Sequence, residues 1–251
     1  MSVWVCVPSA RPVHEVESWA ADWLAHGYRV ALWRDTPEPI RGCLVACGEY
    51  PGYSVAANRL IKDTLNRCSD CDWVVIGGDD VSCDQGHSAE EIARETFNYF
   101  DGRAAEKYFR GSGPGAPPHG GGLAGTFGVM QPTADAFADR SIEKIAGSAW
   151  VGREFCRRMY GGNGPLFSEY TRFFMDQELQ EVAIKYGVFQ QRPDLLHLHR
   201  WYGRASDDLH SETKPAELPE HLKHQEKMWQ PEKQLFYRRQ RAGFPGSEPI
   251  A

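Results

Sequence analysis

The stretch Cys71-Asp72-Trp73-Val74-Val75-Ile76-Gly77-Gly78-Asp79-Asp80 decides the fold of this chain. Its apolar run is too short for a free-standing helix and ends at two glycines followed by two adjacent carboxylates. Such a run predicts a buried strand that stops at the carboxyl edge of a sheet, where open α/β sheets bind their ligands. The glycines would let a ligand approach the backbone, and the aspartates would offer oxygen atoms to a divalent cation. A strand followed by an ordinary polar turn fits the same residues, because Asp and Gly are common turn formers.

The composition is that of a globular protein. Of its 251 residues 41% are hydrophobic and 25% are charged, and the formal net charge is −6. A negative net charge argues against a generally cationic protein that coats nucleic acid. No apolar run approaches the roughly 18 residues that span a bilayer, and the start of the chain lacks a signal-peptide pattern. We therefore expect no membrane association, a cytoplasmic location and reduced thiols for the seven cysteines.

One cysteine pattern has the ligand count of a structural zinc site, namely Cys68-x-x-Cys71 followed by Cys83 and His87. The predicted buried strand lies between the two halves of this pattern, so the ends of the strand would have to fold back on each other. We therefore interpret these thiols as core or surface residues.

Apolar runs and helical periodicity alternate on both sides of the central strand. This order predicts an α/β fold, a doubly wound, mostly parallel sheet with helices on both faces. A capping box at 88–91 marks one helix start. Strands are predicted at 3–7, 28–33, 44–47, 125–130 and 188–191, and helices at 16–24, 57–65, from 88, over 135–159 with an interruption near Gly147, and from 175 to 186.

Residues 1–204 are predicted to form a single domain, and 205–251 a charged, Pro-containing C-terminal extension. Within the extension, 233–241 holds four cations, two aromatic residues and no acid. Such a segment can bind phosphate backbones and stack on bases, although a solvated helix face or tail is the commoner meaning. The Gly- and Pro-rich stretch 111–122 fits a mobile loop, an active-site lid or a linker.

Further polar residues follow other predicted elements. Asp176 opens a late helix, and His197 and His199 follow the last strand. A pair of carboxylates and an imidazole can hold Mn²⁺ or Mg²⁺ and leave positions open for diphosphate oxygens. A separate carboxylate near the cation can accept a proton from an attacking hydroxyl. Together these groups suit displacement of a nucleoside diphosphate from a sugar.

The order of motifs over residues 3–204 resembles the GT-A glycosyltransferases, particularly the large family-two type. Residues 5–9, Val-Cys-Val-Pro-Ser, are similar to that family's first strand and its loop against the nucleoside. Asp35 matches the acid that pairs with the nucleobase, and 52–59 is similar to the glycine-to-asparagine helix start before the metal strand. Gly78-Asp79-Asp80 stands where the family has its Asp-x-Asp motif, although Gly77 replaces the usual first aspartate.

This resemblance implies a metal-dependent inverting glycosyltransferase of the hexosyltransferase type. It implies a nucleotide-diphosphate sugar as donor, with a UDP-sugar favoured, and Mn²⁺ or Mg²⁺ as the metal. The residues implied are Pro8, Ser9, Arg11, Asp35, Asn58 and Asp79 for the donor, Asp80 and His199 for the metal with His197 as the alternative to His199, and Asp176 for the catalytic base.

The acceptor stays open. Trp150, Arg153 and Glu178 are candidate acceptor residues, although Trp150 fits a core position equally well. Because phage enzymes glucosylate hydroxymethyl-pyrimidines in DNA, modified DNA is one acceptor, and a carbohydrate or protein is nearly as compatible. Asp35 also fits a plain turn residue, and Asp176 a helix N-cap.

Two other classes of protein share part of the pattern. A nucleotidyltransferase acting on sugar phosphates would use the same sheet and metal carboxylates, but needs a lysine near the α-phosphate. A non-catalytic nucleic-acid-binding module would rest on residues 233–241 and would not need Asp79, Asp80 or Asp176. Metal-dependent stabilisation by a nucleoside diphosphate would support the glycosyltransferase.

Overall fold

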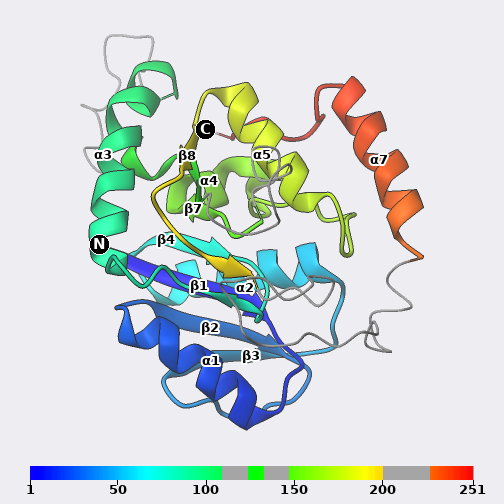
Figure 1. The fold of residues 1–251 in the computed structure, drawn as a ribbon. Helices are drawn as coiled ribbons and strands as arrows, with labels where there is room; N and C mark the ends of the chain where they lie inside the picture. The colour runs from blue at the N-terminus through cyan, green and yellow to red at the C-terminus, as the bar shows by residue number, and fades with distance from the viewer. Residues whose placement is uncertain (109–123, 133–146, 200–226, 251) are drawn as a thin grey trace.

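The computed structural model describes residues 1–108, 124–132, 147–199 and 227–250. The predicted lid or linker at 111–122 and the boundary between 204 and 205 lie outside these residues, so both remain predictions. A seven-stranded sheet in the order β3-β2-β1-β4-β7-β6-β8 forms the centre of the fold, with helices packed around it (Figure 1).

The first half of the sheet is parallel. β1 pairs with β2 and β4, and β2 pairs with β3, all in the same direction. The inner strands β1 and β4 are almost entirely buried, as expected for apolar strands covered on both faces. The carboxyl ends of the four strands share one edge: β1 (Ser2–Pro8), β2 (Arg29–Arg34), β3 (Cys43–Cys47) and β4 (Cys71–Ile76).

The second half of the sheet mixes directions. β7 (Trp150–Gly152) is antiparallel to β4 and to β6 (Val129–Pro132), whereas β8 (Phe189–Arg192) is parallel to β6. The predicted α/β fold with a mostly parallel sheet is confirmed, but the helix predicted over 135–159 is wrong at β7. Three residues are too few to show a strand period. Gly152 is required there because a Cβ would lie 2.0 Å from the Thr126 carbonyl oxygen.

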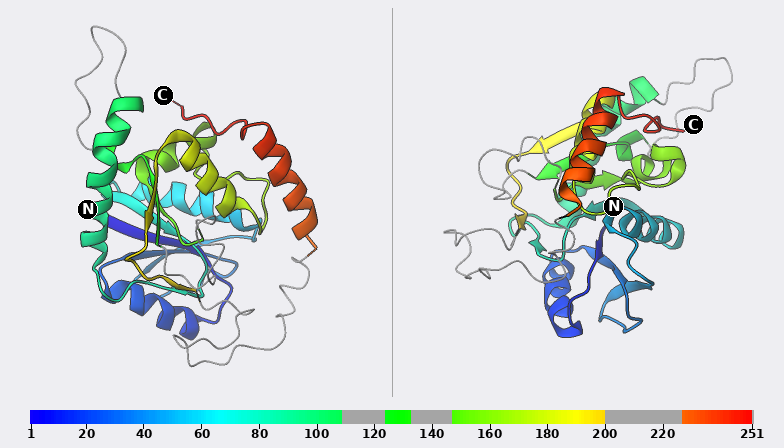
Figure 2. Two further views of the ribbon diagram at one scale, coloured as in Figure 1. Left: turned by 45° about the horizontal axis from the view of Figure 1, so that its top comes forward. Right: turned by 90° about the vertical axis from the view of Figure 1, so that its right-hand side faces the viewer.

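Helices cover both faces of the sheet (Figures 1 and 2). On one face the Cys6 thiol donates to Thr64 of α2 at 3.8 Å, and on the other the Trp73 ring contacts Phe100 of α3 at 5.9 Å. The helices are α1 (Val13–Ala25), α2 (Tyr53–Arg67), α3 (Ala89–Tyr108), α4 (Arg153–Arg158) and α5 (Met175–Tyr186), with 3-10 turns at Ala124–Thr126 and Met159–Gly162. In the described part of the chain, none of the helices is long and apolar enough to cross a membrane.

A small second sheet lies beside the carboxyl edge. β5 (Val81–Ser82) pairs antiparallel with β9 (Leu198–His199), and Val81 lies opposite His199. The indole nitrogens of Trp19 and Trp23 in α1 both donate to the Val81 carbonyl, at 2.7 and 3.2 Å. The segment that follows β4 is therefore held from two sides, by α1 and by β9.

The helix α7 (Trp229–Arg241) lies within the predicted C-terminal extension and packs against α5 (Figure 1). Its inner side carries Phe236, which stacks on Phe174 at 5.5 Å, and Arg239, which pairs with Glu178. The segment 233–241 is therefore part of a helix with a buried side, and the Arg239 side chain on that side forms an ion pair with Glu178 of α5.

Candidate active site at the carboxyl edge

Two loops meet where β1 and β4 end. The Ser9 hydroxyl donates to Asp79 Oδ2 at 2.6 Å, and Arg11 Nε lies 3.2 Å from the same oxygen. The Arg11 backbone N–H in turn donates to Ser9 Oγ at 3.3 Å. Because Ser9 follows a buried strand and Asp79 follows its neighbour, parallel pairing carries both to one edge, as the sequence predicted. The Asp79 carboxylate is held between a hydroxyl and a guanidinium.

The Asp80 carboxylate folds back over the backbone of Gly78. A Cβ on Gly78 would lie 2.2 Å from Asp80 Oδ1, so a glycine at 78 is what leaves room for that carboxylate. Burial lowers the pKa of Arg11, but the charges of Asp79 and Asp80 outweigh burial and raise this pKa above its ordinary value. Both aspartates therefore act on the cation of the β1 loop.

Tyr53 connects the Asp80 side of the site with α5. Its hydroxyl donates to the Gly77 carbonyl at 2.8 Å. Burial raises the pKa of Tyr53 well above its ordinary range, and among its neighbours the charges of Asp176 and Asp80 raise it further. The charges of both carboxylates thus act on one phenol, although 96 positions separate them in the numbering, from 80 to 176. Tyr53 had not been predicted as a site residue.

Asp176 stands in the first turn of α5. Its Oδ1 accepts a hydrogen bond from the backbone N–H of Gln177 at 2.9 Å. The positive end of the helix dipole and this N–H both favour the ionised carboxylate. The residue before the helix, Phe174, has a left-handed backbone with φ of 67° and packs against Trp229 of α7 at 4.9 Å. A strained residue held by α7 thus sets the start of the helix that carries Asp176.

The two late histidines have different surroundings. The backbone of His199 pairs with Val81 of β5, so β9 reaches the residue next to Asp80. His197 is fully buried and meets the Trp23 ring edge-on at 5.4 Å. Burial lowers the pKa of His197 to about 4, so its imidazole is neutral. His197 is a core residue, and His199 remains the candidate metal ligand.

At the end of β2 the structure singles out Arg34 rather than Asp35. Asp35 is exposed, whereas the Arg34 side chain is buried and donates from Nη2 to the Arg11 carbonyl at 3.0 Å. Its Nε and Nη1 atoms are buried and make no hydrogen bond. Buried N–H donors of a charged group that make no hydrogen bond destabilise the fold. Arg34, which contacts the Ser9–Arg11 loop, is therefore a candidate for binding a ligand. The signal in the sequence was an arginine closing an otherwise apolar strand.

Asn58 does not join the site. Its side-chain amide donates to the Leu166 carbonyl at 2.7 Å, and its Oδ1 accepts from the Leu166 N–H at 3.2 Å. Gly164 passes so close that a Cβ there would lie 2.5 Å from Asn58 Oδ1. The predicted donor contact of Asn58 is corrected: this side chain fastens the loop before α5 to α2.

The three candidate acceptor residues also have structural partners. Trp150 is fully buried in β7 and contacts the Tyr28 ring at 5.6 Å. Arg153 donates to carbonyl groups at the end of α2 and the start of β4, including that of Leu65 at 3.1 Å. Such bonds satisfy the last carbonyls of a helix. Trp150 lies opposite Val75 near the carboxyl end of β4 but is buried in the core, and Arg153 lies at the start of β4.

Glu178 is buried within a polar cluster. Its carboxylate accepts from the hydroxyls of Tyr160 and Tyr170, each at 2.8 Å, and from the guanidinium of Arg239. All its oxygen positions are used inside the protein, so it neither contacts an acceptor nor replaces Asp176.

A groove of about 730 Å³ between α5 and α7 includes Ile184 and Tyr237 in its lining and none of the carboxyl-edge residues.

The fold of this chain is loosely similar to several solved structures, at very low sequence identity. No family model matches the sequence, and no curated protein matches it. The catalytic domain of Drosophila β1,4-galactosyltransferase 7 in complex with xylobiose aligns at 9% identity with a TM-score of 0.44, covering 88% of this chain and 78% of that one. A mutant of the same enzyme with manganese, UDP-Gal and xylobiose aligns at 9% identity and 0.42, covering 89% and 79%.

A third structure is a glycosyltransferase involved in glycosylation of the major capsid of PBCV-1. It aligns at 9% identity with a TM-score of 0.40, covering 80% of this chain and 93% of that one. At such scores the likeness is too loose to transfer an activity or a residue role to this chain.

Proposed function

We propose that this chain is a metal-dependent inverting glycosyltransferase that takes a nucleotide-diphosphate sugar, with a UDP-sugar favoured, as its donor. The observation that carries the proposal is the contact of Ser9 and Arg11 with Asp79, the neighbour of Asp80, at the carboxyl edge of the sheet. A cytoplasmic location is part of the proposal, and the free thiols of all seven cysteines support it.

The donor's nucleoside would lie against the loop that follows β1, from Pro8 to Arg11. Asp79, held in place by Ser9 and Arg11, would accept hydrogen bonds from the ribose hydroxyls. Arg11 in this loop and the buried Arg34, which donates to the Arg11 carbonyl, supply two positive charges that would favour an anionic ligand. Asp35 would meet the nucleobase from the exposed end of β2.

The residues present fit a hard divalent cation. Asp80 supplies oxygen atoms, and its carboxylate lies in a space that a side chain at 78 would fill. Asp80, with His199 opposite Val81, would hold Mn²⁺ or Mg²⁺. When bound, the cation would neutralise the charge that develops on the departing diphosphate.

Asp176 would act as the general base. Its carboxylate would accept the proton of the acceptor hydroxyl while the hydroxyl oxygen forms a bond to the anomeric carbon of the sugar. The bond from that carbon to the diphosphate oxygen breaks on the opposite face, and the electron pair leaves with the diphosphate. The base role requires an ionised carboxylate, and the first turn of a helix is a place that suits a negative charge.

Two acceptors fit this proposal: a hydroxymethylated pyrimidine in DNA, or a hydroxyl group of a carbohydrate or protein. Arg239 is not available to DNA, because it pairs with Glu178 at 2.7 Å. Arg238 and Arg241 are exposed on α7 and stay available to a phosphate backbone. If DNA is the acceptor, replacing both with methionine should reduce the salt dependence of binding, because fewer counterions are released.

The test is a thermal-shift panel of UDP, GDP, CDP, ADP and the matching triphosphates, each with and without Mn²⁺. A ligand that binds only the native state raises Tm, so we expect a nucleoside diphosphate, foremost UDP, to raise Tm when Mn²⁺ is present. Release of nucleoside diphosphate during turnover then identifies a glycosyltransferase. A response confined to triphosphates with release of pyrophosphate would identify a nucleotidyltransferase, and a metal-independent response to single-stranded DNA would identify a nucleic-acid-binding module.

A further inference from the structure

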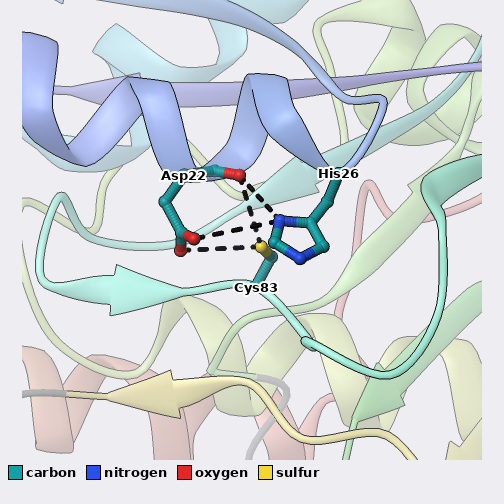
Figure 3. A group of neighbouring side chains, drawn as sticks. All are labelled: Asp22, His26 and Cys83. Carbon is teal, nitrogen blue, oxygen red and sulfur yellow. Dashed lines mark hydrogen bonds and ion pairs between the residues drawn. The ribbon is translucent and has the colours of Figure 1, made fainter.

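A second group of metal-ligating side chains lies apart from the carboxyl edge. It consists of Asp22 and His26, one turn apart on α1, and Cys83, which follows β5 (Figure 3). One ligand atom from each residue lies within 4.8 Å of the other two. The three side chains come from two separate elements and point toward one another (Figure 3).

The position of this group separates it from the proposed active site. α1 begins after β1 at the carboxyl edge and runs back, so that its last turn leads through Gly27 into the start of β2. Asp22 and His26 therefore lie toward the amino edge of the sheet. Cys83 reaches them because β5 and the residues after it run along α1, held by the tryptophan bonds to Val81.

The distances suit a tetrahedral centre. Asp22 Oδ2 lies 3.6 Å from Cys83 Sγ, and Asp22 Oδ1 lies 3.8 Å from His26 Nδ1. Zinc bonds of about 2.0–2.1 Å to oxygen and nitrogen and about 2.3 Å to sulfur place tetrahedral ligands roughly 3.3–3.6 Å apart. The two separations lie within a few tenths of an ångström of that range but involve different oxygens of Asp22, and all three ligand atoms lie within 4.8 Å of one another, so binding would need the three side chains to close around the ion.

The donor set selects the metal. One thiolate, one imidazole and one carboxylate match Zn²⁺, whereas Mn²⁺ and Mg²⁺ prefer oxygen ligands. Gln85 supplies an outer contact, since its Nε2 donates to Asp22 Oδ1 at 3.2 Å and lies 3.5 Å from Cys83 Sγ. Such outer hydrogen bonds hold ligands in position. His26 Nδ1 now contacts the Asp22 carbonyl at 2.8 Å and would exchange that bond for the metal.

A cysteine–histidine nucleophile is the competing interpretation, and the geometry opposes it. The Cys83 side chain is fully buried, so no substrate reaches its sulfur. Its thiol donates to Asp22 rather than to His26. By contrast, the Asp22 and His26 side chains are partly exposed, at 37% and 23%, which leaves the outer side of the group open to a small ligand.

We propose that Asp22, His26 and Cys83 bind one Zn²⁺, with a water molecule in the fourth position. The bound ion would join the end of α1 to the segment three residues beyond Asp80 and so brace the strand end that carries the proposed active site. This proposal does not depend on the glycosyltransferase activity.

The experiment uses the full-length chain carrying Asp80→Asn, which removes the proposed active-site metal ligand. Co²⁺ replaces Zn²⁺ as a probe, because a cysteine thiolate bound to Co²⁺ gives a charge-transfer absorption band. We expect one equivalent of Co²⁺ to produce the band and one equivalent of Zn²⁺ to abolish it. Absence of the band in folded Asp80→Asn protein would overturn the proposal.

Ligand variants and matched controls locate the ion. In the Asp80→Asn background, Asp22→Asn and His26→Gln should each weaken Co²⁺ binding at least about tenfold, because each removes one of three protein ligands. Both residues are partly exposed, so these variants should disturb the fold less than a change at the buried Cys83. His14→Gln on the exposed side of α1 and Cys47→Ser at an exposed thiol should leave affinity unchanged. Unchanged affinity in both ligand variants would place the ion elsewhere.

Discussion

The Ser9 hydroxyl donates a 2.6 Å hydrogen bond to the Asp79 carboxylate and so joins the end of β1 to the end of β4. The two residues are 70 positions apart in sequence, and the parallel pairing of their strands brings them together. This bond sets the direction of a carboxylate that we propose binds the donor ribose. Removing this bond therefore tests whether Asp79 belongs to the donor site.

Ser9→Ala should weaken binding of UDP in the presence of Mn²⁺ by roughly tenfold, because a hydrogen bond to a charged group contributes about 1.5–3 kcal/mol. Isothermal titration calorimetry measures the change. Ser18→Ala, at an exposed position on α1, is the control and should bind like the wild type. Equal affinities in Ser9→Ala and wild type would separate Asp79 from the donor site.

Asp80→Asn should abolish the Mn²⁺-dependent rise in Tm with UDP while leaving the fold intact, since a carboxylate at a strand end contributes little to the core. Gly78→Ala should reduce this rise, because its Cβ would take the place of Asp80 Oδ1 and force that carboxylate to turn away. Asp70→Asn, exposed before the start of β4, serves as control. Metal-dependent stabilisation that survives in both variants would exclude the assignment of Asp80.

Asp176→Asn should lower turnover by roughly two to four orders of magnitude, because the amide cannot accept the acceptor's proton. The amide oxygen of Asn can still accept the hydrogen bond from the Gln177 N–H, so the start of α5 should be preserved. Donor affinity should stay near the wild-type value, since it depends on Asp79 and Asp80. Steady-state kinetics and calorimetry measure the two quantities, with the exposed Glu169→Gln as control. Near-normal turnover in Asp176→Asn would exclude Asp176 as the base.

Arg239→Met should lower the free energy of unfolding by about 3–5 kcal/mol, because it leaves the buried charge of Glu178 without its cation. Denaturant unfolding measures this change. The neighbouring Arg238→Met, at an exposed position, should change stability by no more than about 0.5 kcal/mol. Adding Glu178→Gln to Arg239→Met should cost less than the sum of the single changes. Simple additivity would argue that the pair does not join α7 to α5.

His197 should make stability depend on pH. Burial lowers its pKa from 6.5 to about 4, against a smaller opposing effect of Asp84, so between these values the unfolded chain binds the proton more readily than the native protein. Stability should therefore fall as pH decreases from 6.5 to 4, by about 3 kcal/mol from this residue. His197→Leu should remove that part of the decline in denaturant unfolding, whereas the exposed His14→Gln should keep it. Matching declines in His197→Leu and wild type would contradict the prediction.

The order of strands and helices was predictable from the sequence, because apolar runs and helical periodicity are local properties of the chain. β1, β2, β3 and β4 lie where the runs predicted them, and the carboxylates of Asp79 and Asp80 follow β4 as expected. The approach of β9 to Asp80 was expected from the order of motifs, and the pairing of His199 with Val81 agrees with it.

Partners and burial were decided by the tertiary structure alone. In sequence Glu178 was a candidate acceptor residue and Arg239 lay in a segment whose commoner meaning is a solvated helix face or tail, yet the two residues meet across 61 positions in a buried cluster. Trp150 belongs to a strand too short to show its own period, and Cys83 groups with Asp22 and His26 rather than with Cys68 and Cys71. A side chain's role depends on which distant groups the fold brings within hydrogen-bond reach, and no local pattern contains that information.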